Sequence, residues 1–363
     1  MSVLKSRPVL RWLVPVTAAA TVIGGGAALG TFAAQAEPSL PPRTAAELLV
    51  DLQTSRLEGL SGTVVQRADL GLPPLAGLAG GELGSLLTGT HTLRVWHSGP
   101  DRQRIALLDT LGEKDVIRNG RDVWTWDSRT NTATHRTLPT EGGEPAAPEL
   151  PATPQQAADQ ALAAIDPSTE VSVGRSATVA GRDAYELALA PRDAASLVHQ
   201  VRIAIDAREH VPLRFEVFAD GSDQPAFEMA FTQVDYARPA ADQFAFNPPP
   251  GVKITEESVE RPAGAHRAER PAGERPQART VGEGWTMVVV ARLGGAASGG
   301  AGKPAGAPPA EVAGVLDALP KVSGDWGSGR LLTGKLFSAL LTDDGRLLAG
   351  AVTPERLYEV AKG

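Results

Sequence analysis

Alternation of apolar and polar residues dominates the chain between residues 61 and 236. Successive side chains of a strand point to opposite faces, so this alternation predicts an antiparallel sheet with one dry face and one wet face. Strands lie about 4.8 Å apart, and a sheet of nine or more of them is too wide to stay flat. We therefore expect a strongly curved sheet, with strands at 61–70, 91–97, 102–109, 115–118, 122–127, 132–138, 171–179, 183–190, 199–206, 211–219 and 226–236.

Two amphipathic helices are predicted beside these strands. The first, 44–57, begins with Thr44 as N-cap and with Glu47 in the capping-box position. The second, 153–166, begins after Thr153 and ends before a proline. We expect both helices to lie on the apolar face of the sheet, which gives an α+β fold: a curved antiparallel half-barrel covered by helices.

A third helical segment, 74–89, is apolar but weak. Its glycines at 77, 80, 81 and 84 each cost a helix about 1 kcal/mol relative to alanine. An apolar segment that is poorly held is typical of a movable lid. The predicted lid residues are Leu75, Leu78, Leu83, Leu86 and Leu87.

Two interpretations of the apolar face remain open. The helices and aromatic side chains fill it as an ordinary core, or they cover it incompletely and leave a cavity for an acyl chain. Under the second interpretation Trp124 and Trp126, which share a face of one strand, form the cavity floor. The predicted lining is Leu93, Val95, Ile105, Leu107, Trp124, Trp126, Leu187, Ile203, Phe215, Phe227, Met229 and Phe231.

The composition changes near residue 251 and divides the chain. The stretch that follows is charged, rich in proline and glycine, and contains "ERPAG" twice, which is typical of a disordered linker. A small α+β unit follows, with a strand at 285–293, a helix at 310–320, a hairpin that turns at Asp343-Asp344-Gly345 and a closing helix. The predicted division is 1–36, a signal peptide or membrane anchor; 37–254, the half-barrel; 255–281, the linker; and 282–363, the small C-terminal domain.

The first 36 residues predict a location outside the cytoplasm. A basic start precedes an uncharged apolar run and a small-x-small "AQA" site at 34–36, which is the pattern of a cleaved signal peptide; an uncleaved anchor is the alternative. Removing residues 1–36 takes away Lys5, Arg7 and Arg11 and no acid, so the formal net charge changes from −7 to −10. Such an acidic chain is a poor partner for nucleic acid. It has no cysteine, which excludes disulfides, thiolate metal sites and lipidation of its own cysteine.

Catalytic and metal-binding patterns are missing from the sequence. The six histidines are scattered without an HExxH motif, and neither a GxSxG nor an SxxK motif occurs. "GRLLTGKL" at 329–336 has the glycine and lysine spacing of a phosphate-binding loop, but Leu336 stands where a Ser or Thr should hold magnesium. We expect a non-enzymatic protein without cofactor or metal.

The order of the features resembles a known family. A helix leads into "LSGTVVQR", the "NGRDVWTWDSRTNTATH" hairpin occupies the sheet centre, and "FAFNPPPGVKI" ends the domain. Over residues 44–254 this order resembles the LolA lipoprotein carriers and the N-terminal domain of the RseB/MucB sigma-factor regulators, in particular the actinobacterial type with an appended C-terminal domain. The resemblance implies an open half-barrel with helices across its mouth. In the carriers such a cavity holds lipoprotein acyl chains, and in the regulators the fold helps to control an anti-sigma factor.

Two functions are therefore expected. The first is an extracytoplasmic carrier that holds lipid or lipoprotein acyl chains in the apolar cavity. The alternative is an RseB-like regulator that binds a membrane-anchored anti-sigma factor or another envelope partner. Affinity that rises with acyl-chain length would favour the carrier, and partner binding that depends on the C-terminal domain would favour the regulator.

Overall fold

The computed structural model describes residues 38–55, 57–72, 88–138, 153–163, 165–257, 278–292 and 318–363. From Leu40 onward these residues belong to one compact unit that ends at Gly363. The predicted signal or anchor and the predicted lid lie outside the described residues. No helix within the described ranges is long and apolar enough to cross a membrane.

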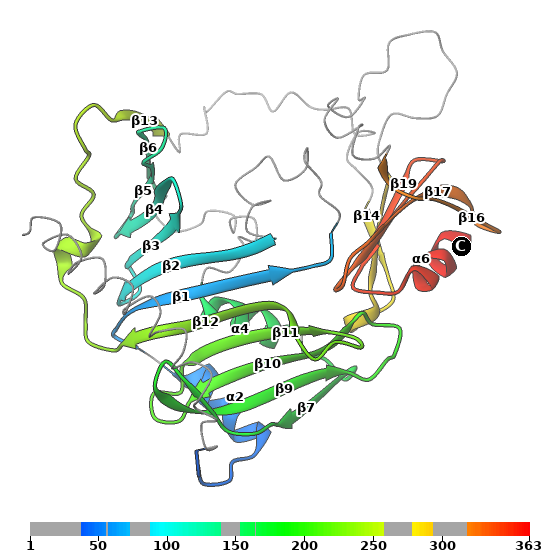
Figure 1. Ribbon diagram of the computed structural model, residues 1–363, viewed down its shortest axis with the longest axis horizontal. Helices are drawn as coiled ribbons and strands as arrows, with labels where there is room; N and C mark the ends of the chain where they lie inside the picture. Colours follow the sequence, from blue (N-terminus) through cyan, green and yellow to red (C-terminus); the bar gives the residue numbers. More distant parts are fainter. Residues whose placement is uncertain are drawn as a thin grey trace, which may run out of the picture. The chain divides into compact units, whose positions relative to one another are not determined.

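A curved, open sheet of 13 strands forms the larger part of the described chain (Figure 1). Its strand order is β13-β6-β5-β4-β3-β2-β1-β12-β11-β10-β9-β7, with β8 paired to β9. The pairs are antiparallel apart from β13 with β6. The strands are β1 (Gly59–Asp69), β2 (Thr88–Ser98), β3 (Arg102–Asp109), β4 (Gly112–Asn119), β5 (Asp122–Asp127), β6 (Thr132–Thr137), β7 (Thr169–Val173), β8 (Ala177–Val179), β9 (Arg182–Pro191), β10 (Val198–Asp206), β11 (Pro212–Ala219), β12 (Pro225–Asp235) and β13 (Lys253–Glu257).

Two helices cover one face of this sheet, which we call the inner face. Helix α2 (Ala45–Thr54) begins with the predicted capping box: Thr44 accepts a hydrogen bond from the Glu47 backbone, and the Glu47 carboxylate accepts one from the Thr44 backbone. Helix α4 (Pro154–Ala163) is the second predicted helix. Leu48 of α2 and Ala158 of α4 join the largest core cluster, together with inner-face side chains of β9, β10 and β11. The predicted α+β fold, a curved antiparallel sheet covered by helices, is confirmed.

One predicted strand, 171–179, is two strands in the structure. β7 ends at Val173 and β8 begins at Ala177. Gly174 lies so close to β9 that a Cβ on it would be 2.6 Å from Glu186 Oε1. The Gly174 backbone N–H still donates a 2.8 Å hydrogen bond to the Glu186 carbonyl, and a residue with a side chain would be crowded at this position, so the break between β7 and β8 follows the glycine.

A second, smaller sheet follows, in the strand order β14-β15-β19-β18-β17-β16. Val288, Leu340, Leu348 and Leu357 form its core with a closing helix, α6. The predicted hairpin at Asp343-Asp344-Gly345 is confirmed, and the predicted helix at 310–320 lies almost wholly outside the described residues. The elements are β14 (Ala278–Val281), η3 (Gly284–Thr286), β15 (Val288–Arg292), β16 (Lys321–Gly324), β17 (Gly327–Thr333), β18 (Ser338–Thr342), β19 (Arg346–Gly350) and α6 (Pro354–Lys362).

Strands β13 and β14 both fall in the range whose composition predicts a linker. All five side chains of β13 are exposed, so no hydrophobic alternation marks it in the sequence. Three of the four side chains of β14 are exposed as well. Backbone pairing with β6 and β15 defines these strands, and a hydrophobic pattern does not report such pairing.

Candidate functional site

Ten of the twelve predicted cavity residues share the inner face. Leu187, Ile203, Phe215 and Met229 form one row of directly paired residues across β9, β10, β11 and β12. Phe227 lies on the same face, two positions from Met229 along β12. Phe231 also belongs to this face, and Val64 links it to Leu93 on β2. The remaining members, Val95, Ile105 and Leu107, are register partners on β2 and β3.

These inner-face residues are packed into two core clusters. Leu187, Ile203 and Phe215 are buried against α2 and α4. Leu93, Val95, Met229 and Phe231 are buried in the second cluster, with Ile105, Leu107 and Phe227 partly buried at its margin. In the described part of the chain, the helix-covered half of the inner face is therefore a filled core.

Trp124 and Trp126 lie on the opposite face, which we call the outer face. They do share one face of β5, but the register pairs Ile105 with Val116 and Val116 with Thr125, so the inner-face residue of β5 is Thr125. The prediction that the two tryptophans line the same surface as Leu93 and Ile105 is wrong. The error arises at the tight turns between β3, β4 and β5, because a shift of one residue in register moves every side chain to the other face.

Burial changes face along the sheet, which explains where the tryptophans lie. In β3, β4 and β6 the deeply buried side chains Ala106, Ile117 and Ala133 belong to the outer face. The inner-face residue Val116, in contrast, is 45% exposed. The helices cover the inner face at β9–β11, and a different segment covers the outer face at β3–β6.

That segment, which we call the strap, comprises the residues from Ala241 to Val252. Its 3₁₀ helix η2 (Ala241–Phe244) contacts β3 and β4 and buries Phe244 almost completely. Phe246 follows and lies over the tryptophan pair, with its ring centre 4.9 Å from that of Trp124 and 6.4 Å from that of Trp126. The two tryptophans and Phe246 form an aromatic cluster beneath the strap.

A charged group is buried in the same layer. Asp115 is 2% exposed, and its Oδ2 accepts a hydrogen bond of 2.5 Å from Arg104. Burial is the main cause that raises the pKa of this carboxyl to about 6, with Glu113 adding to the rise and Arg104 opposing it. Its other oxygen and the indole nitrogen of Trp126 are buried without a hydrogen-bond partner.

His135 connects this layer to the sheet edge. Its ring stacks on Trp124, with centres 4.2 Å apart and planes 15° from parallel. Its Nδ1 lies 2.7 Å from Glu256 Oε2 on β13, and its Nε2 lies 3.1 Å from Asp122 Oδ1 on β5. Desolvation lowers the pKa of His135, but the hydrogen bonds to Glu256 and Asp122 outweigh it, so the net shift is upward. Both carboxylates favour the imidazolium form.

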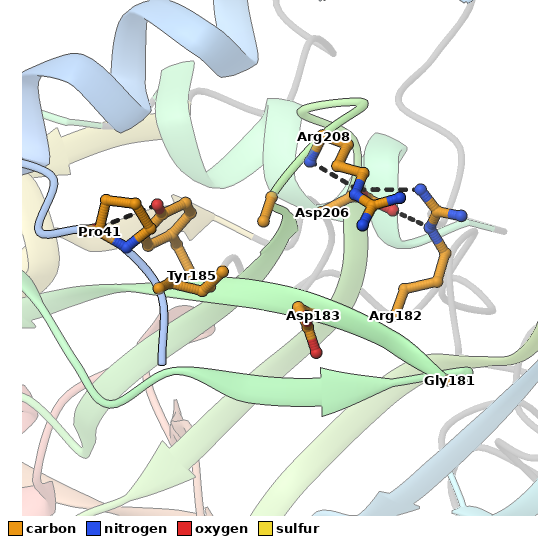
Figure 2. Close-up of a pocket in the computed structure, with 9 residues that line it drawn as sticks. Pro41, Gly181, Arg182, Asp183, Tyr185, Asp206 and Arg208 are labelled. Atoms are coloured by element: carbon orange, nitrogen blue, oxygen red, sulfur yellow. Dashed lines mark hydrogen bonds and ion pairs between the residues drawn. The ribbon is translucent and has the colours of Figure 1, made fainter. Parts of the chain in front are cut away.

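A pocket of about 350 Å³ lies at the other half of the sheet, where β9 begins and β10 ends (Figure 2). Its deepest group is the buried carboxylate of Asp206, which accepts hydrogen bonds from the Arg182 side chain, from Tyr236 Oη at 2.9 Å and from the backbone N–H groups of Arg208 and Glu209. Burial raises the pKa of Asp206, but these hydrogen bonds outweigh it and hold the pKa below its usual value. With every lone-pair direction in use, Asp206 is a structural group.

A second pocket, of about 200 Å³, opens between β1, β2 and β12. Its lining includes Arg94 and Trp96 on the outer face, and the guanidinium of Arg94 lies 5.2 Å from the centre of the Trp96 ring. Arg104 lies at the same distance from that ring. The two arginines and the tryptophan continue the aromatic layer beyond the strap.

Sequence reasoning missed His135, Phe246 and Glu256. A signal for the strap was present in the sequence, where "FAF" and "PPP" precede "KITEE". A proline run between two extended segments indicates a chain that crosses a surface without joining a ladder. The predicted lid leucines between 75 and 87 lie outside the described residues. The described ranges contain no group of three or more His, Cys, Asp or Glu placed to hold a metal ion.

Residues 87–249 match the family model described as the MucB/RseB N-terminal domain. This match confirms the resemblance to the RseB/MucB regulators over that part of the chain. No curated protein matches the chain.

Solved structures show similarity at low identity. A chain from the MucA/MucB complex of Pseudomonas aeruginosa is 20% identical, with 87% of this chain and 96% of that chain covered and a TM-score of 0.44. MucB in complex with MucA(peri) gives 20% identity, coverage of 87% and 97%, and a TM-score of 0.43. A LolA superfamily protein from Nitrosomonas europaea is 11% identical, with 56% of this chain and 99% of that chain covered and a TM-score of 0.23.

Proposed function

We propose that this chain is an extracytoplasmic, non-enzymatic regulatory protein that binds a segment of a membrane-anchored envelope partner. The observation that carries the proposal is the match of residues 87–249 to the MucB/RseB N-terminal domain, together with the second sheet on the same chain. MucB occurs in complexes with MucA, and the partner class proposed here for this chain is a membrane-anchored anti-sigma factor.

The packing of the inner face favours a protein partner over a lipid guest. The residues that would line an acyl cavity under α2 and α4 are buried against one another and against the helices. Inserting a chain there requires the core to open, which costs the packing free energy of the displaced contacts. Binding at exposed surfaces requires no such opening.

The test is capture of a membrane partner by the full-length chain from membranes of its own host. We expect one membrane-anchored protein to be retained, and we expect the second sheet to contribute. Two exposed apolar residues, Val289 on β15 and Met287 just before that strand, supply the variants Met287→Ser and Val289→Ser, which leave the core of the second sheet untouched. Val50→Ser on α2 is the matched control, because Val50 is also an exposed apolar residue but lies on the larger sheet's helix.

Loss of capture in the Met287 and Val289 variants, with capture kept in the Val50 variant, is the expected result. If all three variants capture the partner as well as the unaltered chain, the second sheet has no part in binding. If no membrane protein is retained by any of them, the regulatory function is refuted.

A lipid carrier is the second candidate, and one observation favours it. At β4 the inner face lies beyond the two helices, and Val116 is left 45% exposed beside the partly buried Ile105. An acyl chain in that region would bury its methylenes at about 0.8 kcal/mol each, which is about fourfold in affinity per methylene. Displacement of a fluorescent fatty acid by chains of increasing length measures this slope. A flat response, or a slope that is unchanged in Val116→Thr, contradicts the carrier function.

A further inference from the structure

The strand β13 is a weakly secured element of the large sheet. It is five residues long, lies at the sheet edge and pairs with β6 in the parallel sense, whereas the other described pairs of this sheet are antiparallel. None of its side chains is buried. A parallel ladder is slightly weaker per residue than an antiparallel one, and β13 adds no buried apolar side chain to it.

The strap is secured independently of β13. Phe244 is buried against β3 and β4, and Phe246 packs on Trp124 and Trp126. Only after the prolines at 248–250 and Gly251, whose φ of 76° suits glycine, does the chain turn into β13. The hydrogen bond from the Lys253 backbone N–H to the Asn131 carbonyl, 3.0 Å long, marks the start of the ladder. β13 can therefore leave the β6 edge while the strap stays in place.

Two residues of β6 lie beside outer-face side chains of the strand that pairs with this edge. The register places Ile254 beside Ala133 and Glu256 beside His135, and these residues share the outer face. Ala133 is small, apolar and buried, and its register partner Ile254 remains 45% exposed. His135 is held between Asp122 and Glu256. The edge therefore suits a strand in which an apolar residue is followed, two positions later, by a carboxylate.

We propose that the outer edge of β6 is a docking site for an extended segment of a partner protein, which replaces β13 in the parallel sense. The segment carries an apolar residue in the place of Ile254 and a carboxylate in the place of Glu256. Addition of a strand to a sheet edge uses backbone hydrogen bonds for affinity and alternate side chains for specificity. The proposal rests on the proposed function, since it names the contact through which the envelope partner binds.

A reversible lock tests this exchange in the full chain. Thr134 and Thr255 are register partners on β6 and β13, and the chain has no cysteine of its own. In the double variant Thr134→Cys with Thr255→Cys, oxidation ties β13 to β6, and reduction of the same sample releases it. The matched control is Val116→Cys with Thr125→Cys, a register pair between β4 and β5 that places a disulfide away from the edge.

The probe is a fluorescent synthetic peptide with the sequence GVKITEE, which is that of residues 251–257. We expect it to bind the reduced lock variant and the oxidised control variant, and to bind the oxidised lock variant at least about tenfold more weakly. A peptide with Gln in the position of Glu256 should bind about tenfold more weakly, because it loses a charge-assisted hydrogen bond to His135. This difference should vanish in the variant His135→Asn.

Three outcomes overturn the proposal. Equal binding to the oxidised and reduced lock variants places the peptide elsewhere, and no binding to either shows that the edge does not accept a segment in trans. In the third outcome, reduction of the lock variant doubles its molecular mass in solution and the peptide dissociates the resulting dimer. That result assigns the edge to β13 of a second copy of this chain and not to another protein.

The membrane-partner capture, repeated with the lock, separates this proposal from the proposed function. Capture that is equal in the oxidised and reduced states keeps the regulatory function and removes the β6 edge from it. Peptide exchange at β6 without capture of any membrane protein keeps the exchangeable edge and removes the regulatory function.

Discussion

The variant Leu187→Ala tests whether the helix-covered inner face is a filled core. Leu187 has no exposed surface, pairs with Ile203 and packs in the cluster that includes Leu48 of α2. Truncating a fully enclosed leucine costs about 2–5 kcal/mol, the sum of lost transfer free energy and an unfilled cavity. For a domain of this size, a loss of about 3 kcal/mol corresponds to a fall in Tm of about 6–12 °C.

Urea unfolding followed by tryptophan fluorescence measures the effect, and Leu111→Ala is the matched control. Leu111 lies in the turn between β3 and β4 and is 81% exposed, so the same chemical change should alter the free energy of unfolding by less than about 0.5 kcal/mol. The urea m-value should stay constant in both variants. A loss below about 1 kcal/mol for Leu187→Ala would refute the filled core and restore the acyl cavity under the helices.

Three further predictions concern the titratable groups. Asp206→Asn should lower the free energy of unfolding by about 2–3 kcal/mol at pH 7, because Arg182 loses its charged partner. Since the pKa of Asp206 is depressed in the folded chain, this stabilisation is present above the unfolded pKa and disappears as pH falls through the folded pKa. Acid unfolding of the unaltered chain and of Asp206→Asn should show the difference. The raised pKa of His135 makes its contribution complete below the unfolded pKa and lost as pH rises through the folded one. The protection factors of the β13 amides should therefore fall across that range, and they should be low throughout in His135→Asn. Asp115, with a pKa of about 6, should make the chain more stable as pH falls from about 6 toward about 4, and Asp115→Asn should abolish that rise in a pH series of urea midpoints.

The strands and helices were predictable because their hydrophobic pattern is local. Alternation places ten predicted lining residues on one face, and the Thr44 and Glu47 capping box marks the start of the first helix to within a residue, although the helix ends at Thr54 and not at 57. Face identity across neighbouring strands was not predictable, because it depends on turn registers that hydrophobicity does not encode. Trp124 and Trp126 illustrate the limit: they are apolar residues on a face that the strap covers.

The candidate site at the β6 edge was hidden for a different reason. β13 consists of exposed residues in a charged stretch, and its only structural signal is backbone pairing with a strand more than a hundred residues earlier. The contact between His135 and Glu256 is likewise long-range. The hydrophobic pattern of a sequence indicates which side chains are buried. The pairing of β13 with β6 and the contact between His135 and Glu256 involve exposed residues of β13, so that pattern does not indicate them.

The change of covered face along the large sheet has a consequence for how substitutions accumulate in this chain. In β9 and β10, selection should resist change at the inner-face residues Leu187 and Ile203 and at the buried carboxylate of Asp206. In β4 the phase is inverted: Ile117 is enclosed, and its neighbour Val116 is free to vary. A saturation survey should therefore find the inner-face positions of β9 and β10 intolerant, and in β4 the outer-face position Ile117 intolerant beside a tolerant inner-face Val116, so that new recognition surfaces can evolve on opposite sides of a single sheet.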